Sequence, residues 1–297
     1  MTSPSTSAAT RPVFLLGHPV AHSLSPRLHS AAFAAAGVDA VYVAADVAPD
    51  ELPSAVAGLR ALGALGANLT VPHKVAALGL VDRRTSEVDA VGAANTLFWD
   101  GDELAADNTD AAGLEGVLRD ELHLRPGTRA LVLGSGGAAR AAAVALGRVG
   151  AAVAVRARRP EAGDRVAALA RAHGAAGPFD GPPRVVVNAT PLGLGGESLP
   201  DDLMRLGPGQ VALDLLYGRT TPFLQAASDR GATAVDGLSM LVRQAAASFT
   251  RWTGAPAPLD AMRAAAWDVS TDGPGDLLRS RGGPRDAGGV PRRRGGE

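Results

Sequence analysis

Short apolar runs alternate with longer amphipathic or alanine-rich segments along most of the chain. The apolar runs predict buried strands, which we expect at residues 12–16, 41–45, 66–71, 130–133, 152–155, 184–188, 210–216 and 232–235. The longer segments predict helices at residues 27–36, 50–62, 111–122, 138–149, 161–172, 222–230, 236–252 and 258–267. This alternation is typical of an α/β fold built on a doubly wound parallel sheet.

One part of the pattern departs from that alternation. Two apolar runs, at residues 91–99 and 103–106, lie on either side of Asp100-Gly101. Asp-Gly is a dipeptide that the tight turn between two antiparallel strands favours. We therefore expect a β-hairpin here, before the helix that begins near residue 111.

A glycine-rich turn joins the strand at 130–133 to the helix that follows it. Its residues are Gly134-Ser135-Gly136-Gly137-Ala138-Ala139. Gly134, Gly136 and Ala139 occupy the small positions of the pattern G-x-G-x-x-G/A, in which backbone and helix N-terminus hold a pyrophosphate. A glycine-rich turn without a ligand is the alternative, but the strand before it and the helix after it favour a dinucleotide site.

The next strand, at 152–155, ends in Arg156-Ala157-Arg158-Arg159. A site for NAD usually has Asp or Glu at this strand end, where the carboxylate binds the ribose hydroxyl. Guanidinium groups pair with phosphate instead. We therefore predict NADP as the cofactor, with Arg158 or Arg159 on its 2′-phosphate. A solvated cluster of charges is the alternative.

The composition limits the classes of partner and site. The 297 residues include 29 basic and 30 acidic side chains, a balance that argues against a nucleic-acid or anionic-membrane partner. The chain has no cysteine, which excludes disulfides and thiolate chemistry and fits a cytoplasmic location. No histidines have a zinc-protease spacing, and we expect no metal site. Residues 1–11 and 270–297 are expected to be disordered tails.

Polar residues gather at the predicted strand ends, where open α/β sheets bind their ligands. They include Ser23, Thr70, Lys74, Asn95, Asp110, Tyr217 and Gln244. Lys74 and Asp110 are the leading acid–base candidates, ahead of His22 and His73. A free lysine, with a pKa of ~10.4, is too basic for this task at neutral pH, but desolvation in a cleft makes a lysine less basic. Spacing alone favours the simpler interpretation, a surface lysine and a helix-capping aspartate.

Hydroxyl side chains precede two of the predicted helices. Ser25 suits the N-cap of the first helix, with Pro26 at its first position. Ser23 has no such duty, and a helix N-terminus flanked by hydroxyls can also bind a carboxylate. Thr109 is a further candidate cap, next to Asp110.

Taken together, the motifs resemble the shikimate dehydrogenase family over residues 13–267. The matching stretches lie at residues 17–26, 68–74, 92–96, 108–110, 134–140, 188–193, 214–217 and 237–241, with Gln244. They include Asn68-Leu69-Thr70-Val71-Pro72-His73-Lys74, Asn108-Thr109-Asp110 and Asp214-Leu215-Leu216-Tyr217. The ordered set, rather than any one stretch, carries the resemblance.

The resemblance implies reversible NADPH-linked reduction of 3-dehydroshikimate to shikimate, a step of aromatic amino-acid (chorismate) biosynthesis. It implies that Lys74 and Asp110 form the catalytic pair. The substrate-binding residues that it implies are Ser23 and Ser25 for the carboxylate, Thr70, Asn95 and Gln244 for ring hydroxyls, and Tyr217 beside them. The cofactor residues that it implies are Gly134, Ser135, Gly136, Gly137, Ala138, Ala139, Arg158, Arg159, Thr190, Gly237 and Met240.

The fold implied is a Rossmann-like doubly wound NADP-binding domain plus a second α/β substrate domain, with the substrate in a central cleft. We assign residues 12–110 and 238–269 to a discontinuous substrate-binding domain and residues 111–237 to the NADP-binding domain. The expected partner is the small-molecule substrate, and a homodimer is left open.

Two positions depart from the family pattern. Members that use NADP usually have Asn-Arg-Thr where this chain has Ala157-Arg158-Arg159, and Ser135 replaces the commoner alanine. NADP stays the prediction because Arg158 is retained. A quinate/shikimate dehydrogenase, an aminoshikimate dehydrogenase and a catalytically silent NADP-binding regulator stay open as alternatives.

Overall fold

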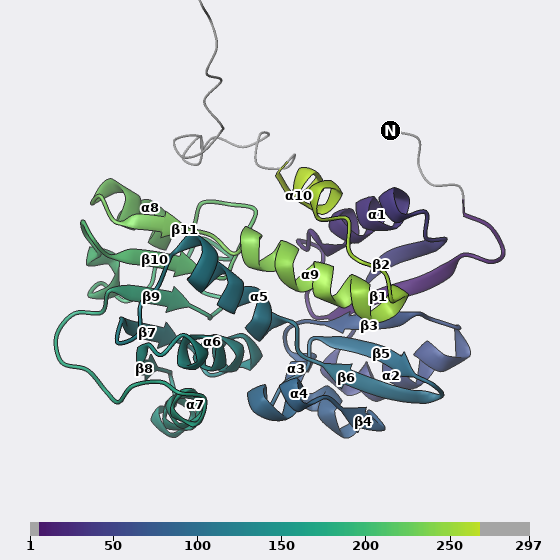
Figure 1. Ribbon diagram of the computed structural model, residues 1–297, viewed down its shortest axis with the longest axis horizontal. Helices are drawn as coiled ribbons and strands as arrows, with labels where there is room; N and C mark the ends of the chain where they lie inside the picture. The colour runs from purple at the N-terminus through teal and green to yellow at the C-terminus, as the bar shows by residue number, and fades with distance from the viewer. Residues whose placement is uncertain (1–5, 268–297) are drawn as a thin grey trace, which may run out of the picture.

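The computed structural model describes residues 6–267, and the strands in that part of the chain form two sheets (Figure 1). The first sheet has the order β2-β1-β3-β5-β6-β4 and consists of β1 (Arg11–Gly17), β2 (Ala40–Asp46), β3 (Gly66–Leu69), β4 (Arg83–Arg84), β5 (Thr96–Asp100) and β6 (Glu103–Asp107). The second has the order β11-β10-β9-β7-β8 and consists of β7 (Arg129–Leu133), β8 (Ala152–Arg156), β9 (Val185–Asn188), β10 (Val211–Asp214) and β11 (Thr233–Val235). The predicted α/β class is confirmed.

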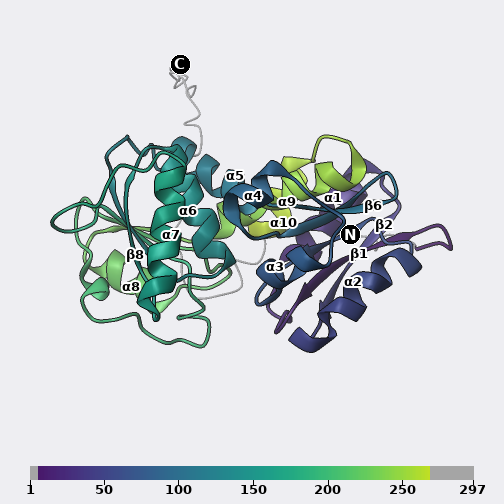
Figure 2. The ribbon, with the colours of Figure 1, turned by 90° about the horizontal axis from the view of Figure 1, so that it is seen from below.

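All neighbouring strands of the second sheet run parallel. Along β9, Val185 and Val187 belong to one apolar core and Val186, between them, to another, so both faces of this sheet are buried. Helices α6 (Gly137–Arg148) and α7 (Pro160–Ala172) pack side by side over the first core (Figure 2), and α8 (Pro222–Asp229) covers the second. A strand buried on both faces needs a continuous apolar run, which explains the pattern seen in the sequence.

The first sheet is mixed. β1 pairs in parallel with β2 and β3, whereas β5 pairs antiparallel with β3 and β6. The predicted hairpin is confirmed, with Gly101 at a φ of 62° in its turn. Its first strand begins at Thr96 rather than at residue 91, which is the last residue of helix α4 (Ser86–Val91), and residues 92–95 connect the two elements. Val91, the one residue of the apolar run within α4, is buried there at helical spacing from Val88, and Gly92, at a φ of 68°, ends the helix.

The remaining helices surround the first sheet and connect it to the second. They are α1 (Ser25–Ala36), α2 (Leu52–Ala61), α3 (His73–Ala76), α5 (Asp110–Gly116), α9 (Leu238–Thr253) and α10 (Leu259–Trp267). Helix α9 crosses the middle of the molecule and packs against α5 and α1 (Figure 1). Its Phe249 and Trp252 share an apolar core with Val13 of β1 and Leu28 of α1, so the end of the chain returns to the first sheet.

The division into domains at residues 110 and 238 stays a prediction. The two sheets themselves occupy residues 11–107 and 129–235. The predicted disordered lead is wrong in its second half: Arg11 begins β1, and the hydroxyls of Ser7 and Thr10 both donate to the Asp39 carboxylate. The predicted C-terminal tail lies outside the described residues.

The predicted cap of α1 is wrong. The helix begins at Ser25 itself, and no side chain caps it. Ser23 Oγ instead accepts a hydrogen bond from the backbone N–H of Ser25, at 3.2 Å. The Ser25 hydroxyl is therefore not used in capping.

The predicted caps of α5 are also wrong. Neither Thr109 nor Asp110 caps this helix with its side chain. Asn108 Oδ1 does so, accepting from the backbone N–H groups of Asp110 and Ala111 at 3.1 and 3.2 Å. Because Asn108 takes this duty, the Asp110 carboxylate can make other contacts.

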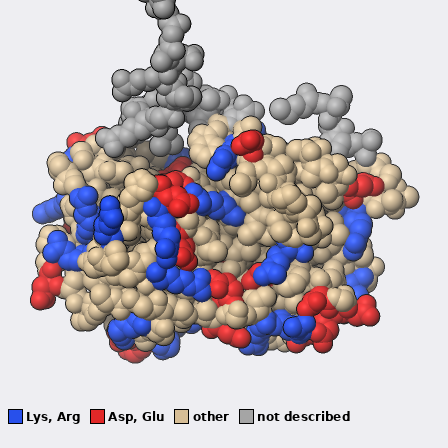
Figure 3. Space-filling view, in the orientation of Figure 1, with Lys and Arg blue, Asp and Glu red and all other residues tan. Residues whose placement is uncertain are grey.

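Acidic and basic side chains are interspersed on the face that Figure 3 shows, as expected from the near-neutral net charge. Within residues 6–267, the structure contains no helix whose length and apolar character would let it cross a membrane.

His29 of α1 is a polar residue in an apolar core. It is fully buried and stacks on Tyr42 with the ring centroids 4.4 Å apart. Neither ring nitrogen has a hydrogen-bond partner in the described part of the chain. Burial lowers the pKa of His29 from 6.5 to about 3, and the Asn68 side chain opposes that shift only in part. The imidazole is therefore neutral in the folded protein at neutral pH.

We expect His29 to weaken the fold in acid. Between about pH 6.5 and pH 3 the unfolded chain binds a proton that the folded protein does not. The free energy of unfolding should therefore decrease as the pH is lowered through this range, by up to about 1.4 kcal/mol per pH unit from this group. Urea titrations at several pH values should show a smaller fall in His29→Phe than in the wild type. His123→Asn, at an exposed histidine, is the control, and equal slopes in all three proteins would contradict the prediction.

Candidate active site

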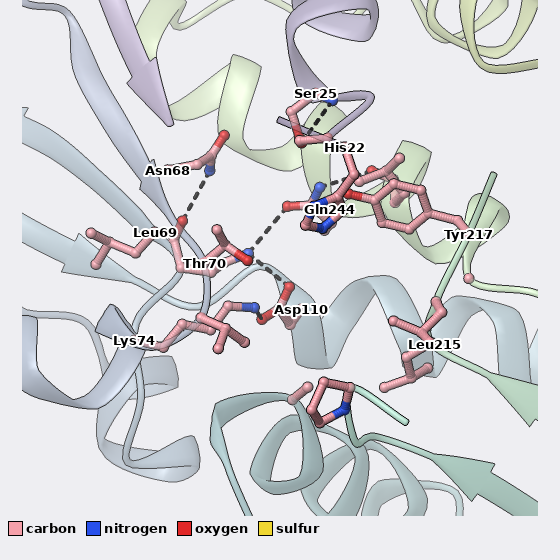
Figure 4. Close-up of a pocket in the computed structure, with 18 of the residues that line it drawn as sticks. His22, Ser25, Asn68, Leu69, Thr70, Lys74, Asp110, Leu215, Tyr217 and Gln244 are labelled. Atoms are coloured by element: carbon pink, nitrogen blue, oxygen red, sulfur yellow. Dashed lines mark hydrogen bonds and ion pairs between the residues drawn. The ribbon is translucent and has the colours of Figure 1, made fainter. Parts of the chain in front are cut away.

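A cavity of about 270 Å³ lies between the two sheets, at the carboxyl ends of β1, β3, β9 and β10 (Figure 4). Of the site residues predicted from the sequence, it is lined by Ser23, Ser25, Thr70, Lys74, Asn95, Asp110, Ala138, Thr190, Tyr217, Gly237, Met240 and Gln244. Residues predicted for the cofactor that do not line it are Gly134, Ser135, Gly136, Gly137, Ala139, Arg158 and Arg159. His22 lines the cavity, whereas His73 is buried with its Nε2 2.8 Å from the Val47 carbonyl oxygen.

Lys74 and Asp110 face each other in this cavity and form an ion pair (Figure 4). The distance from Lys74 Nζ to Asp110 Oδ2 is 2.5 Å, and the two side chains are 15% and 6% exposed. Lys74 lies on α3, the short helix after β3, and Asp110 is the first residue of α5. A paired ammonium and carboxylate at this depth can bind a hydroxyl or carbonyl and transfer a proton to or from it.

Asn95 orients Asp110. Its Nδ2 lies 2.9 Å from Asp110 Oδ1, 2.8 Å from Thr109 Oγ1 and 3.2 Å from Gln244 Oε1. Asn95 Oδ1 accepts from the backbone N–H of Thr109 at 2.8 Å, so this amide is held from both ends. Asp110 thus uses one carboxylate oxygen for Asn95 and the other for Lys74.

Tyr217 and Ser25 lie across the cavity from Lys74 (Figure 4), and Ser23 also lines the cavity. Burial raises the pKa of Tyr217, although hydrogen bonds with Ser23 and the Leu24 backbone lower it. The phenol is therefore neutral and can donate a hydrogen bond. Together with the serine hydroxyls it forms a polar patch that suits an anionic or hydroxylated group.

A buried pair, Asn188 and Asp214, holds the two loops that reach the cavity from the second sheet. Asp214 Oδ1 accepts from Asn188 Nδ2 at 3.0 Å and from the backbone N–H of Leu216 at 3.1 Å. Asn188 Oδ1 accepts from the Thr190 hydroxyl at 2.7 Å. Since Thr190 and Tyr217 line the cavity on these two loops, the pair fixes both sides of this wall together.

The glycine turn has the geometry of a pyrophosphate loop. Gly134 has a φ of 112°, and a Cβ there would lie 2.9 Å from the Ala189 carbonyl oxygen, so only glycine fits. A Cβ on Gly136 would meet no atom within 4 Å, so the backbone there is open to a ligand. The N-terminus of α6 follows directly. These residues fit a dinucleotide phosphate.

The three arginines after β8 differ in their surroundings. Arg156 Nη1 forms an ion pair with Asp202 at 2.7 Å. Arg158 and Arg159 are exposed, and neither forms an ion pair with any other residue in 6–267. Two guanidinium groups are therefore available for a phosphate, and the third is already paired with a carboxylate.

The sequence interpretation missed several buried polar residues that support the cavity from behind. Asn68 Nδ2 donates to the Asn95 carbonyl and to Ser248 Oγ, at 3.0 and 3.1 Å. Like Asn188 and Asp214, Asn68 is a buried residue of a short strand whose other residues are all or nearly all buried. A carboxylate or amide inside such an apolar run is a signal that could have found all three, because a buried polar group needs a partner.

Lysine usage is a second signal that was overlooked. The 29 basic residues are 28 arginines and one lysine, and that lysine is Lys74. Arginine stays protonated in proteins, whereas lysine can lose its proton. Because every other basic position is arginine, the single lysine indicates that an exchangeable proton is needed at position 74.

Two protein-family models match the chain. The model of the shikimate dehydrogenase substrate binding domain matches residues 15–97, and that of the shikimate 5′-dehydrogenase C-terminal domain matches residues 237–266. The curated shikimate dehydrogenase (NADP(+)) of Anaeromyxobacter sp. (strain Fw109-5) is 45% identical over 276 residues, which are 85% of this chain and 94% of that protein. That of Moorella thermoacetica is 42% identical over 288 residues, covering 90% and 97%.

Solved structures share the whole fold. Shikimate dehydrogenase from Thermus thermophilus, in complex with NADP(H) and shikimate, has a TM-score of 0.75 at 35% identity and covers 88% of this chain and 100% of its own. The enzyme from Aquifex aeolicus has a TM-score of 0.80 at 31% identity, covering 88% and 99%. The 5-ketofructose reductase of Gluconobacter sp. strain CHM43 has a TM-score of 0.75 at 30% identity, covering 89% and 100%. One fold therefore serves more than one substrate.

Asp214 should make stability depend on pH in the opposite sense to His29. Burial raises the pKa of Asp214 from 3.8 to about 6, against hydrogen bonds from Thr221, Leu216 and Asn188 that lower it. Between these values the folded protein binds more protons than the unfolded chain, so the free energy of unfolding falls as pH rises. Asparagine cannot ionise. In urea titrations, the free energy of unfolding of Asp214→Asn relative to that of the wild type should therefore increase by roughly 2–3 kcal/mol between pH 4 and pH 7.

The matched control for this measurement is Asp229→Asn, at an exposed aspartate of α8. A difference between Asp214→Asn and the wild type that stays constant with pH would show that Asp214 does not titrate in this range.

Proposed function

The chain belongs to the shikimate dehydrogenase family, and from this premise we propose that it reduces 3-dehydroshikimate to shikimate with NADPH, reversibly, in the biosynthesis of aromatic amino acids. The observation that carries the proposal is the buried ion pair of Lys74 and Asp110, 2.5 Å long, in a cavity that faces both sheets. The Thermus thermophilus relative, whose structure contains NADP(H) and shikimate, has the same fold.

Lys74 is the proton donor in this proposal. Reduction of a ketone adds a hydride to the carbonyl carbon and a proton to the carbonyl oxygen. The ammonium of Lys74 gives up that proton, and the neutral amine takes one back from the alcohol in the reverse direction. An arginine could not do so, which explains why the lone lysine of the chain lies here.

Asp110 holds Lys74 and the reacting oxygen in place. One carboxylate oxygen contacts the ammonium and the other accepts from Asn95, so the carboxylate cannot rotate away. With 6% of its side chain exposed, Asp110 is shielded from water, and its field on the ammonium is screened little.

The substrate-binding residues follow from the same arrangement. We assign the substrate carboxylate to Ser23 and Ser25, with the Tyr217 hydroxyl beside them. Asn95 Nδ2 contacts both Asp110 Oδ1 and Gln244 Oε1. We assign the ring hydroxyls to Thr70, Asn95 and Gln244. All six line the cavity, which supports the assignment.

The coenzyme residues come from the turn at the start of α6, from the segment after β8, and from the segments around β9 and α9. We assign the pyrophosphate to the turn Gly134-Ser135-Gly136-Gly137-Ala138-Ala139, and the 2′-phosphate to Arg158 and Arg159. Thr190, Gly237 and Met240 line the cavity and are assigned to the nicotinamide end. When bound, NADPH supplies the hydride.

Substrate choice is the part of this proposal that most needs an assay, because a 5-ketofructose reductase shares the fold. Purified protein should be offered shikimate and quinate separately, each with NADP and with NAD, while NADPH or NADH absorbance is followed. Turnover with shikimate and NADP, and little otherwise, is the expected result. Turnover mainly with quinate would indicate a quinate/shikimate dehydrogenase, and NADP binding without any turnover would indicate a regulator. A cytoplasmic location and a homodimer remain predictions from the sequence.

Lys74→Met should lower kcat by about 10²–10⁴-fold, because the proton donor is lost, with the Michaelis constant for shikimate changed much less. Lys74→Arg is the matched control, since it keeps the charge beside Asp110 but cannot release a proton. Steady-state kinetics of both variants test the role. Near-normal kcat in Lys74→Arg would mean that Lys74 contributes only its charge.

Arg158→Ala should raise the Michaelis constant for NADP by about tenfold and leave that for NAD almost unchanged. A tenfold loss corresponds to about 1.4 kcal/mol, within the range of one charge-assisted contact to phosphate. Arg156→Ala is the control, since Arg156 is already paired with Asp202. An equal rise for NADP and NAD would place the 2′-phosphate elsewhere.

A further inference from the structure

Gly137 is a glycine that the pyrophosphate fingerprint does not explain. The fingerprint needs small residues at Gly134, Gly136 and Ala139, and position 137 is unrestricted in it. Gly137 is the first residue of α6, and it is not among the glycines with a positive φ. Helical residues generally favour alanine over glycine. Local structure therefore gives no reason for glycine at this position.

The reason lies across the boundary between the two sheets. A Cβ on Gly137 would lie 3.0 Å from both Cβ and Cδ of Lys74, and 3.5 Å from Cβ of Ala93. Contacts of 3.0 Å between carbon atoms are too short to persist, so one side would have to move. At the neighbouring Gly136, a Cβ would meet nothing within 4 Å. Two adjacent glycines thus face different surroundings, one open and one packed on Lys74.

Lys74 has little room to retreat. Its carbonyl oxygen accepts from the backbone N–H of Ala94 at 2.7 Å. Its neighbour His73 is buried, with Nε2 2.8 Å from the Val47 carbonyl oxygen, which anchors α3. A methyl group at position 137 would therefore push either the lysine side chain away from Asp110 or α6 away from α3.

We propose that Gly137 is a positioning residue for Lys74: its bare backbone packs against the aliphatic part of the lysine and keeps the ammonium on Asp110. This inference rests on the proposed function, in which Lys74 is the proton donor. The lysine explains why residue 137 has no side chain, while its backbone stays part of the turn assigned to the pyrophosphate. The start of α6 then serves both the coenzyme and the proton donor, with Gly136 facing the phosphate and Gly137 facing the lysine.

The kinetic test is Gly137→Ala. A contact of 3.0 Å requires the neighbouring group to move by a few tenths of an ångström. Since a displacement of about 1 Å in a reacting group can cost up to 10²-fold in rate, we expect kcat to fall by about 3- to 10-fold. The Michaelis constant for NADP should change less than threefold. Gly136→Ala should have the opposite effect: the Michaelis constant for NADP should rise by a larger factor than kcat falls. Gly58→Ala, on α2 where a Cβ also meets nothing within 4 Å, is the control for the substitution itself.

The single lysine offers a readout that does not depend on turnover. In protein labelled with ¹³C-lysine, the one Cε signal in an NMR spectrum belongs to Lys74. Gly137→Ala should shift this signal, and Gly58→Ala should leave it in place. An unshifted signal together with unchanged kcat would overturn the inference. A wild type that is inactive with shikimate would refute the proposed function, while the NMR comparison would still test the contact.

A double variant separates action through Lys74 from general damage. In the Lys74→Gly background the Cβ, the Cδ and the ammonium are all absent, so adding Gly137→Ala should change the residual kcat less than twofold. If Gly137→Ala alone fails to fold, recovery of folding in the double variant would attribute the failure to the lysine. Failure to fold in both proteins, or a full further loss of kcat in the double variant, would show that Gly137 does not act through Lys74.

Discussion

The ammonium of Lys74 and the carboxylate of Asp110 lie 2.5 Å apart with little access to water, and the rest of the site is built to keep them there. Removing two charges from water is costly, and attraction between them offsets the cost only when the remaining polar atoms also find partners. Asn95 supplies one such partner, and Asn108 frees Asp110 by capping α5 in its place. If one partner were misplaced, a buried charge would lose its compensating contact and its full desolvation cost would destabilise the fold.

The mixed pairing of the first sheet makes this ion pair possible. β3 and β6 both pair antiparallel with β5, with Asn68 opposite Thr96 and Thr96 opposite Asp107. That register brings the segment after β3, the start of β5 and the segment after β6 to the same edge. Lys74, Asn95 and Asp110 come from these three segments. An all-parallel arrangement would have required longer crossovers and could not have joined β5 to β6 by a tight turn.

The second sheet contributes through its loops and through the helix that returns from it. Asn188 and Asp214 tie the loop of Thr190 to the loop of Tyr217, so these residues keep one spacing. Helix α9 then places Gln244 beside Asn95, while Phe249 buries the other end of the helix in the first core. The cavity is complete only when both sheets and α9 are in place, which couples the proposed catalysis to the docking of the two halves.

The amino-acid sequence by itself determined most of the strands and helices, the hairpin and the glycine turn, because these depend on periodicities and turn residues that act over a few positions. It did not predict the short elements α3, α4 and β4. It also pointed to Lys74, Asp110 and the serines as candidates, through their places at strand ends and through the family resemblance. Only the tertiary structure decided that Asn108 rather than Asp110 caps α5. It also decided that Arg156 forms an ion pair with Asp202 and that Gly137 packs on Lys74. Each of these outcomes depends on which side chains the sheet register and the docking of α6 bring together, and local pattern carries little information about such pairings.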